Sequence, residues 1–77
     1  MPPTSAPDPA LARVLRRERV RLGKSQEALA HEARVTVATL ARIEREHANP
    51  TWTTVRRIAA GLGLSLVDLA RAVERES

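Results

Sequence analysis

The side chains with a capacity for chemistry in this sequence are mainly arginines. Of the 13 basic residues only Lys24 is a lysine, and the formal net charge is +4. A guanidinium stays charged and presents a planar fork of N–H donors, which suits phosphate groups and base edges better than proton transfer. A basic balance favours a polyanionic partner, although many small domains carry such charge for solubility alone.

Neither an enzyme nor a metal site is predicted. Serine, histidine and aspartate occur, but without the arrangement of a nucleophile and an activating base, and there is no glycine-rich phosphate loop. His31 and His47 lack partners at metal-ligand spacing, and the chain has no cysteine. We therefore expect no catalysis, no metal and no cofactor.

Length and patterning set the domain organisation. The 77 residues suffice for one domain, and no apolar run approaches the ~20 residues that span a bilayer. Residues 1–7 are proline-rich and lack the basic start and apolar stretch of a signal peptide. We expect a flexible tail over residues 1–7, one domain over residues 8–77, a cytoplasmic location and no membrane partner.

Helix signals recur along residues 8–77, whereas strand signals do not. Capping residues followed by apolar residues at helical spacing predict an all-α fold of five short helices. The first is expected at about residues 9–22, the second ends near Ala33 and the fourth ends at Gly63. The expected caps are Asp8, Ser25, Thr36, Thr51 and Ser65.

Each expected helix has an apolar stripe that predicts its buried face. Trp52 heads the stripe of the fourth helix, so it is expected to anchor the core rather than to stack on a base. The stripes comprise Leu11, Val14, Leu15 and Leu22; Leu29, Ala30 and Ala33; Leu40 and Ile43; Trp52, Val55, Ile58, Ala59 and Leu62; and Leu66, Leu69, Ala70 and Val73.

The segment from Gln26 to Arg45 carries the signal of a helix-turn-helix. Two helices joined by a short turn must bury each other's inner faces, and the apolar stripes of this segment, together with Val35, supply those contacts. This geometry lets the second helix lie in a major groove while the first crosses the backbone. Arg42 on the outer face is then the best candidate for base readout, since arginine bonds guanine bidentately. The alternative is an exposed arginine on a solvated face.

Four segments in order resemble the Xre/Cro-type, lambda-repressor-like regulators: Leu22 to Ala30, Ile43 to Arg45, Asn49 to Thr51, and Ile58 to Ser65. The resemblance covers about residues 10–70. It implies a compact five-helix domain whose third helix reads the major groove. The sequence departs from the family pattern at Lys24, where an apolar residue is usual, and at Arg34 and Glu46, where glycine is usual.

The resemblance also implies roles for individual residues. Gln26 would contact a phosphate and brace the third helix, and Arg19 and Glu44 would form an internal salt bridge, the alternative being two solvated charges. The groove-facing set would be Thr36, Val37, Ala38, Ala41, Arg42 and Arg45.

Further polar residues are candidates for phosphate contacts, which position a protein without reading sequence. They are Lys24, Arg34, Arg45 and Asn49. For the charged residues the alternative is ordinary surface charge. Thr51 is better explained as a helix cap. The arginines that crowd the first helix mostly form a solvated face, although one could reach the DNA backbone.

These observations predict a sequence-specific regulator of transcription, a repressor or autoregulator, that binds double-stranded DNA at a pseudo-palindromic operator. Such domains usually pair across a two-fold axis, so we expect a homodimer. No small-molecule effector is evident. The alternative is a protein-interaction module, such as an antitoxin or co-regulator. The expected dimer surface comprises Leu66, Leu69, Ala70 and Val73.

Overall fold

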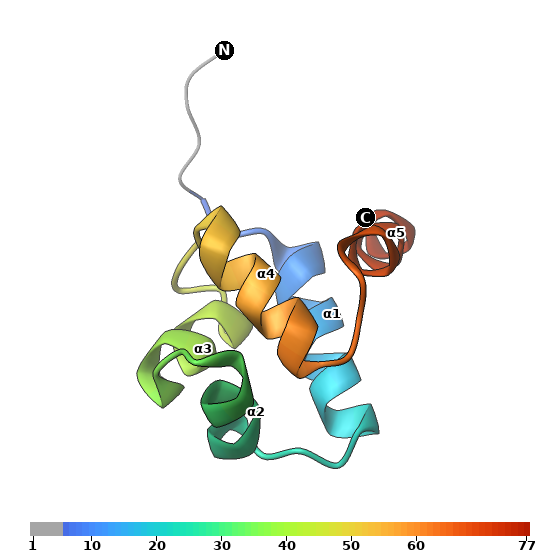
Figure 1. The fold of residues 1–77 in the computed structure, drawn as a ribbon. Coiled ribbons are helices and arrows are strands. Elements are labelled where there is room, and N and C mark those ends of the chain that lie inside the picture. Colours follow the sequence, from blue (N-terminus) through green and yellow to red (C-terminus); the bar gives the residue numbers. More distant parts are fainter. Residues whose placement is uncertain (1–5) are drawn as a thin grey trace.

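The computed structural model describes residues 6–77, and these residues form five α-helices and no strand (Figure 1). The predicted all-α, five-helix fold is therefore confirmed. Residues 1–5 of the expected tail lie outside the described residues, so that prediction is untested there. The helices are α1 (Pro9–Arg21), α2 (Gln26–Ala33), α3 (Val37–Glu44), α4 (Trp52–Gly61) and α5 (Leu66–Glu76).

All five helices begin at the capping residues that the sequence predicts. In each cap a side-chain oxygen accepts a hydrogen bond from a backbone N–H two or three residues further on. These bonds satisfy N–H groups that have no acceptor inside the helix. The start of each helix is thus fixed locally, by Asp8, Ser25, Thr36, Thr51 and Ser65.

The ends of α2 and α3 use charged residues where glycine is usual. Arg34 has a φ of 59° and Glu46 a φ of 62°, so both adopt the left-handed conformation. At each end the N–H of the next residue also donates back to a carbonyl of the helix: Val35 to Ala30 at 3.0 Å, and His47 to Arg42 at 2.8 Å. The turns keep their shape although a side chain in this conformation costs about 1–2 kcal/mol relative to glycine.

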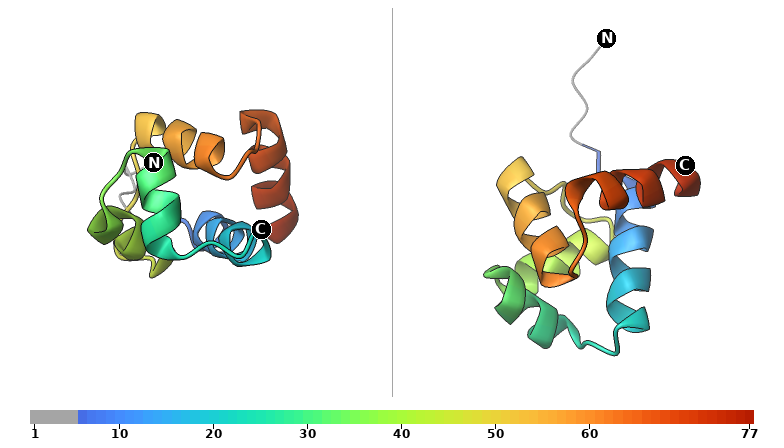
Figure 2. Two further views of the ribbon diagram at one scale, coloured as in Figure 1. Left: turned by 60° about the horizontal axis from the view of Figure 1, so that its bottom comes forward. Right: turned by 45° about the vertical axis from the view of Figure 1, so that its right-hand side comes forward.

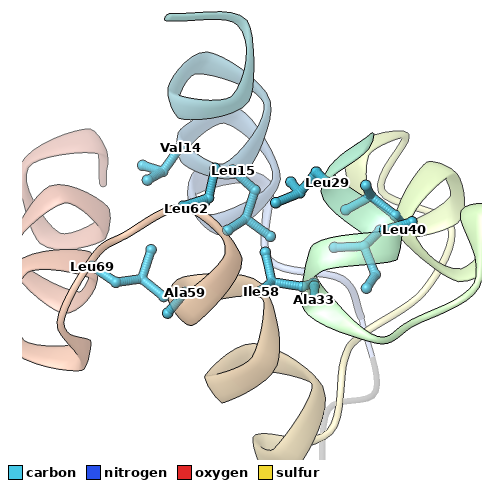
Figure 3. Close-up of a cluster of buried hydrophobic side chains, with 11 residues drawn as sticks. Val14, Leu15, Leu29, Ala33, Leu40, Ile58, Ala59, Leu62 and Leu69 are labelled. Atoms are coloured by element: carbon cyan, nitrogen blue, oxygen red, sulfur yellow. The ribbon is translucent and has the colours of Figure 1, made fainter. Parts of the chain in front are cut away.

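The helices pack as a ring around one core. The close contacts run from α1 to α5, α4, α2, α3 and back to α1. In the left view of Figure 2, α2 and α3 lie on one side and α5 on the other, with α4 and α1 along the remaining two. The side chains that fill the centre converge from all five helices (Figure 3), and the largest of them are Val14, Leu15, Leu29, Leu40 and Ile58.

The predicted core is wrong at three apolar positions, because Trp52, Leu22 and Ala70 are all exposed. Trp52 is 64% exposed, because it occupies the first turn of α4, at the edge of the ring. Leu22, at the end of α1, is 39% exposed for the same reason. A helical stripe predicts which face is apolar, but it does not predict where the neighbouring helices stop covering that face.

The crossing of α2 and α4 depends on a small residue. A Cβ atom at Gly61 would lie 3.0 Å from Leu29 Cδ1 and 3.3 Å from the backbone nitrogen of Ala33. Because Leu29 is fully buried, it has little room to give way. Gly61 thereby sets how closely α4 approaches the first helix of the helix-turn-helix.

Within residues 6–77, none of the helices has the combination of length and apolar character needed to cross a bilayer.

Candidate nucleic-acid interface

The two faces of α3 differ sharply. Leu40 and Ile43 are buried against the core and fix the helix to the body. The opposite face lies at the edge of the molecule (Figure 1). Of the predicted groove-facing set, Ala41 is partly buried and the others are exposed, namely Thr36, Val37, Ala38, Arg42 and Arg45.

Side chains on this outer face are free to meet another molecule. Among residues 6–77, the guanidinium groups of Arg34, Arg42 and Arg45 form no ion pair or hydrogen bond. The hydroxyl of Thr36 is already engaged, since it caps α3 and donates to Thr39 Oγ1 at 2.8 Å. The face therefore offers the uncommitted charges of Arg42 and Arg45 beside a strip of small apolar groups, and Arg34 lies in the turn that precedes α3.

Beneath this face, Arg19 of α1 and Glu44 of α3 form a two-point ion pair. Arg19 Nε lies 2.8 Å from Glu44 Oε2, and Nη2 lies 2.9 Å from Oε1. Their side chains are 12% and 2% exposed. Hydrogen bonding to Glu44 raises the pKa of Arg19 above its ordinary value, against the opposing effect of burial.

Gln26 joins the same network. Its Nε2 donates to Glu44 Oε1 at 3.2 Å, and Arg19 Nη1 donates to the carbonyl of Lys24 at 2.9 Å. The last turn of α1, the start of α2 and the end of α3 are thus held together by one carboxylate and one guanidinium. The network braces α3 from behind and leaves its outer face clear.

Lys24 forms contacts within the chain that the sequence does not predict. Its Nζ pairs with Glu32 and donates to the carbonyl of Gly61 at 2.9 Å, where α4 ends. This ammonium ties the α1–α2 loop to α2 and α4, and the phosphate contact expected of Lys24 stays a prediction. Asn49 is exposed in the loop that precedes α4, and Thr51 caps that helix.

The expected dimer surface needs one correction. Leu69 is only 3% exposed and belongs to the core of the single chain, because α5 packs against α1 and α4 at this point. Around it lies an open apolar groove of about 340 Å³, which we call the α4–α5 groove. Its apolar lining comprises Leu11, Trp52, Val55, Leu66, Leu69, Ala70 and Val73.

Two residues lie where the sequence does not predict them, one on the α4–α5 groove and one on a separate polar recess. Trp52 lies on the α4–α5 groove instead of in the core. Arg16 lies with Gln26 and Arg45 around a polar recess. The spacing of Arg16, three residues before Arg19 on one face of α1, is the signal that could have singled it out from the other arginines.

Comparison with known proteins agrees with this geometry. A family model described as helix-turn-helix matches residues 15–69. The chain belongs to this helix-turn-helix family. It is an Xre-type regulator of transcription with a DNA-binding fold, as the resemblance in its sequence predicts.

Solved structures similar to this regulator include the restriction-modification controller protein C.Esp1396I. The wild-type protein superposes with a TM-score of 0.84 at 26% identity, covering 88% of each chain. The same protein as a tetramer in complex with its natural 35 base-pair operator gives a TM-score of 0.84 at 26% identity, covering 88% of this chain and 90% of that one. A search of the curated proteins gives no match.

Proposed function

We propose that this regulator binds a specific operator as a homodimer and represses transcription by occupying the promoter. The observation that carries the proposal is the outer face of α3, which is exposed, uncommitted and positively charged at Arg42 and Arg45. Its inner face is fixed by Leu40 and Ile43. A helix anchored in this way can enter a major groove without rearrangement of the domain.

Within the major groove, the polar and apolar residues of α3 would make different contacts. Arg42 would bond the O6 and N7 atoms of a guanine, which is the commonest specific contact of an arginine. Val37, Ala38 and Ala41 have no polar side-chain atoms, so they would contact thymine methyl groups and allow close approach. With so few polar contacts, the shape of the operator would contribute to specificity.

Phosphate contacts would flank this helix. Arg34 precedes α3 and Arg45 follows it, while Gln26 begins α2 and Asn49 precedes α4. These residues come from the ends of three helices, where a groove-bound α3 would bring the two DNA backbones near. Such contacts would fix the register of α3 without reading bases.

The homodimer would form through the α4–α5 groove. Trp52 is 64% exposed and lines this apolar groove, so a monomer would leave a continuous apolar surface in contact with water. A second copy of the chain would cover Trp52, Leu66, Ala70 and Val73 of both protomers across a two-fold axis. C.Esp1396I assembles on its operator as a tetramer, so domains of this shape can associate on DNA.

Selection of bound sites from a pool of random duplexes tests the proposal. The expected product is an inverted repeat whose half-sites lie about 34 Å apart, one helical turn. Ala38→Glu should abolish the enrichment, because it adds a carboxylate to the groove-facing surface. Ala60→Glu adds the same charge to an exposed part of α4 and serves as the matched control.

Lack of any enriched sequence, with weak binding to every duplex and little dependence on salt, would overturn the proposal. That result would favour the protein-interaction alternative, in which the α4–α5 groove binds an unrelated partner.

A further inference from the structure

A polar recess separates the middle of α1 from the start of α2 and the end of α3. Its volume is about 360 Å³, and its lining comprises Arg16, Arg19, Gln26, Glu44 and Arg45. Three of these side chains are cationic and one is anionic. The recess thus has an excess of positive charge before any ligand is considered.

The single carboxylate of the recess is already neutralised. Both oxygens of Glu44 accept from Arg19, and one also accepts from Gln26. The charges of Arg16 and Arg45 are not offset, since neither guanidinium has an ion pair or a hydrogen bond within residues 6–77. Two guanidinium groups that share a recess but lack counter-charges favour an anion between them.

Arg16 differs from its neighbours on α1. Arg13 and Arg17 pair with Glu76 of α5, while Arg21 pairs with Glu18 on its own helix. Arg19 pairs with Glu44. In the described part of the chain, Arg16 is therefore the arginine of α1 whose charge is not offset by a carboxylate.

The start of α2 adds a second attraction for an anion. The side-chain hydroxyl of Ser25 accepts from the backbone N–H of Ala28, and its backbone carbonyl accepts from the backbone N–H of Leu29. The backbone N–H groups of Gln26 and Glu27 have no acceptor among the described residues. They belong to the positive end of the helix dipole, beside the recess that Gln26 lines.

We propose that Arg16, together with Arg45, binds a phosphodiester group of the DNA backbone in this recess, so that α1 takes part in the DNA interface. The inference rests on the proposed function and extends it to a residue outside the helix-turn-helix. Arg45 borders both the recess and the groove-facing side of α3. When α3 lies in a major groove, the DNA backbone beside that groove therefore lies over the recess. The contact positions the protein and reads no base.

Salt titration of binding to a mixed-sequence duplex of about 30 base pairs tests this contact, because each neutralised phosphate adds about 0.9 to the slope of log K against log salt. Arg16→Gln should lower that slope by about 0.9 per protomer, and Arg16→Lys should restore most of it. Arg17→Gln is the matched control: it removes the same charge from the adjacent position, whose side chain turns toward Glu76. It should leave the slope within error of wild type.

Equal slopes for Arg16→Gln and Arg17→Gln would overturn this inference alone, provided that the wild-type protein still selects an operator. Absence of salt-dependent binding by the wild-type protein would overturn the proposed function as well. Inorganic phosphate, replacing chloride at constant ionic strength, distinguishes the source of the anion. It should not compete with the duplex, and tight competition that depends on Arg16 would identify a site for small anions instead.

Discussion

The guanidinium of Arg19 and the carboxylate of Glu44 join α1 to α3 at two points, with N–O distances of 2.8 and 2.9 Å. Both side chains are largely removed from solvent. The attraction between them offsets the cost of burying each charge, so the pair matters most when one partner is lost. It also holds α3 in position against α1.

Replacement of Arg19 by methionine should therefore destabilise the domain. The change leaves the buried carboxylate of Glu44 with a single donor, Gln26, and breaking a buried pair costs about 3–5 kcal/mol. Urea unfolding followed by circular dichroism measures the loss. The double variant Arg19→Met/Glu44→Met should recover most of it, because no charge stays buried. A single variant as stable as wild type would show that the pair contributes nothing.

Arg34→Gly should raise stability while lowering DNA affinity. Arg34 holds a φ of 59°, which glycine adopts without a steric penalty, so the free energy of unfolding should rise by about 1 kcal/mol. Thermal unfolding measures this gain. Binding to DNA should weaken if the side chain contacts a phosphate. Arg34→Ala is the control, since it removes the charge but keeps a Cβ atom, and it should weaken binding without the gain in stability.

The sequence predicts the local features of this fold well because their causes are local. Asp8, Thr36 and Ser65 cap helices by bonding N–H groups within three residues, so no distant contact is needed to recognise them. At Arg34 and Glu46 the sequence shows only that the usual glycine is replaced, and it is the structure that places both residues in the left-handed conformation.

Features that depend on tertiary packing were predicted less well. Trp52 and Leu69 both lie on the apolar stripe of their helix, yet Trp52 is exposed and Leu69 is buried in the core. Only the position of α5 against α1 and α4 decides between them. The role of Lys24 depends on where α4 ends, 37 residues further along the chain.

A charge on the α4–α5 groove should separate the protomers. Ala70 is exposed and lines the groove, so Ala70→Glu should place a carboxylate in the apolar seam and yield monomers by sedimentation equilibrium. Val67→Glu is the control on the same helix, because Val67 is 59% exposed and lies outside the groove. If Ala70→Glu remains dimeric, the seam lies elsewhere. Leu69→Glu would not discriminate, since it would disrupt the core.

Stability should depend on Glu76 in a pH-dependent manner. Hydrogen bonds from Arg17, and then from Arg13, lower the pKa of Glu76 below its ordinary value of 4.5. A carboxyl whose pKa falls on folding stabilises the native state above its unfolded pKa and loses that effect as the pH falls through the native value. The difference in Tm between wild type and Glu76→Gln should thus be present at neutral pH and vanish in acid. The double variant Arg13→Gln/Arg17→Gln should abolish this difference at every pH, and its persistence would assign the effect to another contact.

Arg42→Ala should relax the preference for one base pair in each half-site. Arg42 is exposed near the end of α3 with no partner among the described residues, and a bidentate contact to guanine contributes about 1–3 kcal/mol of discrimination. Competition between the selected operator and single-base variants measures the change at each position. Arg45→Ala should instead weaken binding to all sequences alike and lower the salt slope, as expected of a phosphate contact. An unchanged base preference in Arg42→Ala would remove this residue from the readout set and leave specificity to the apolar strip and the shape of the duplex.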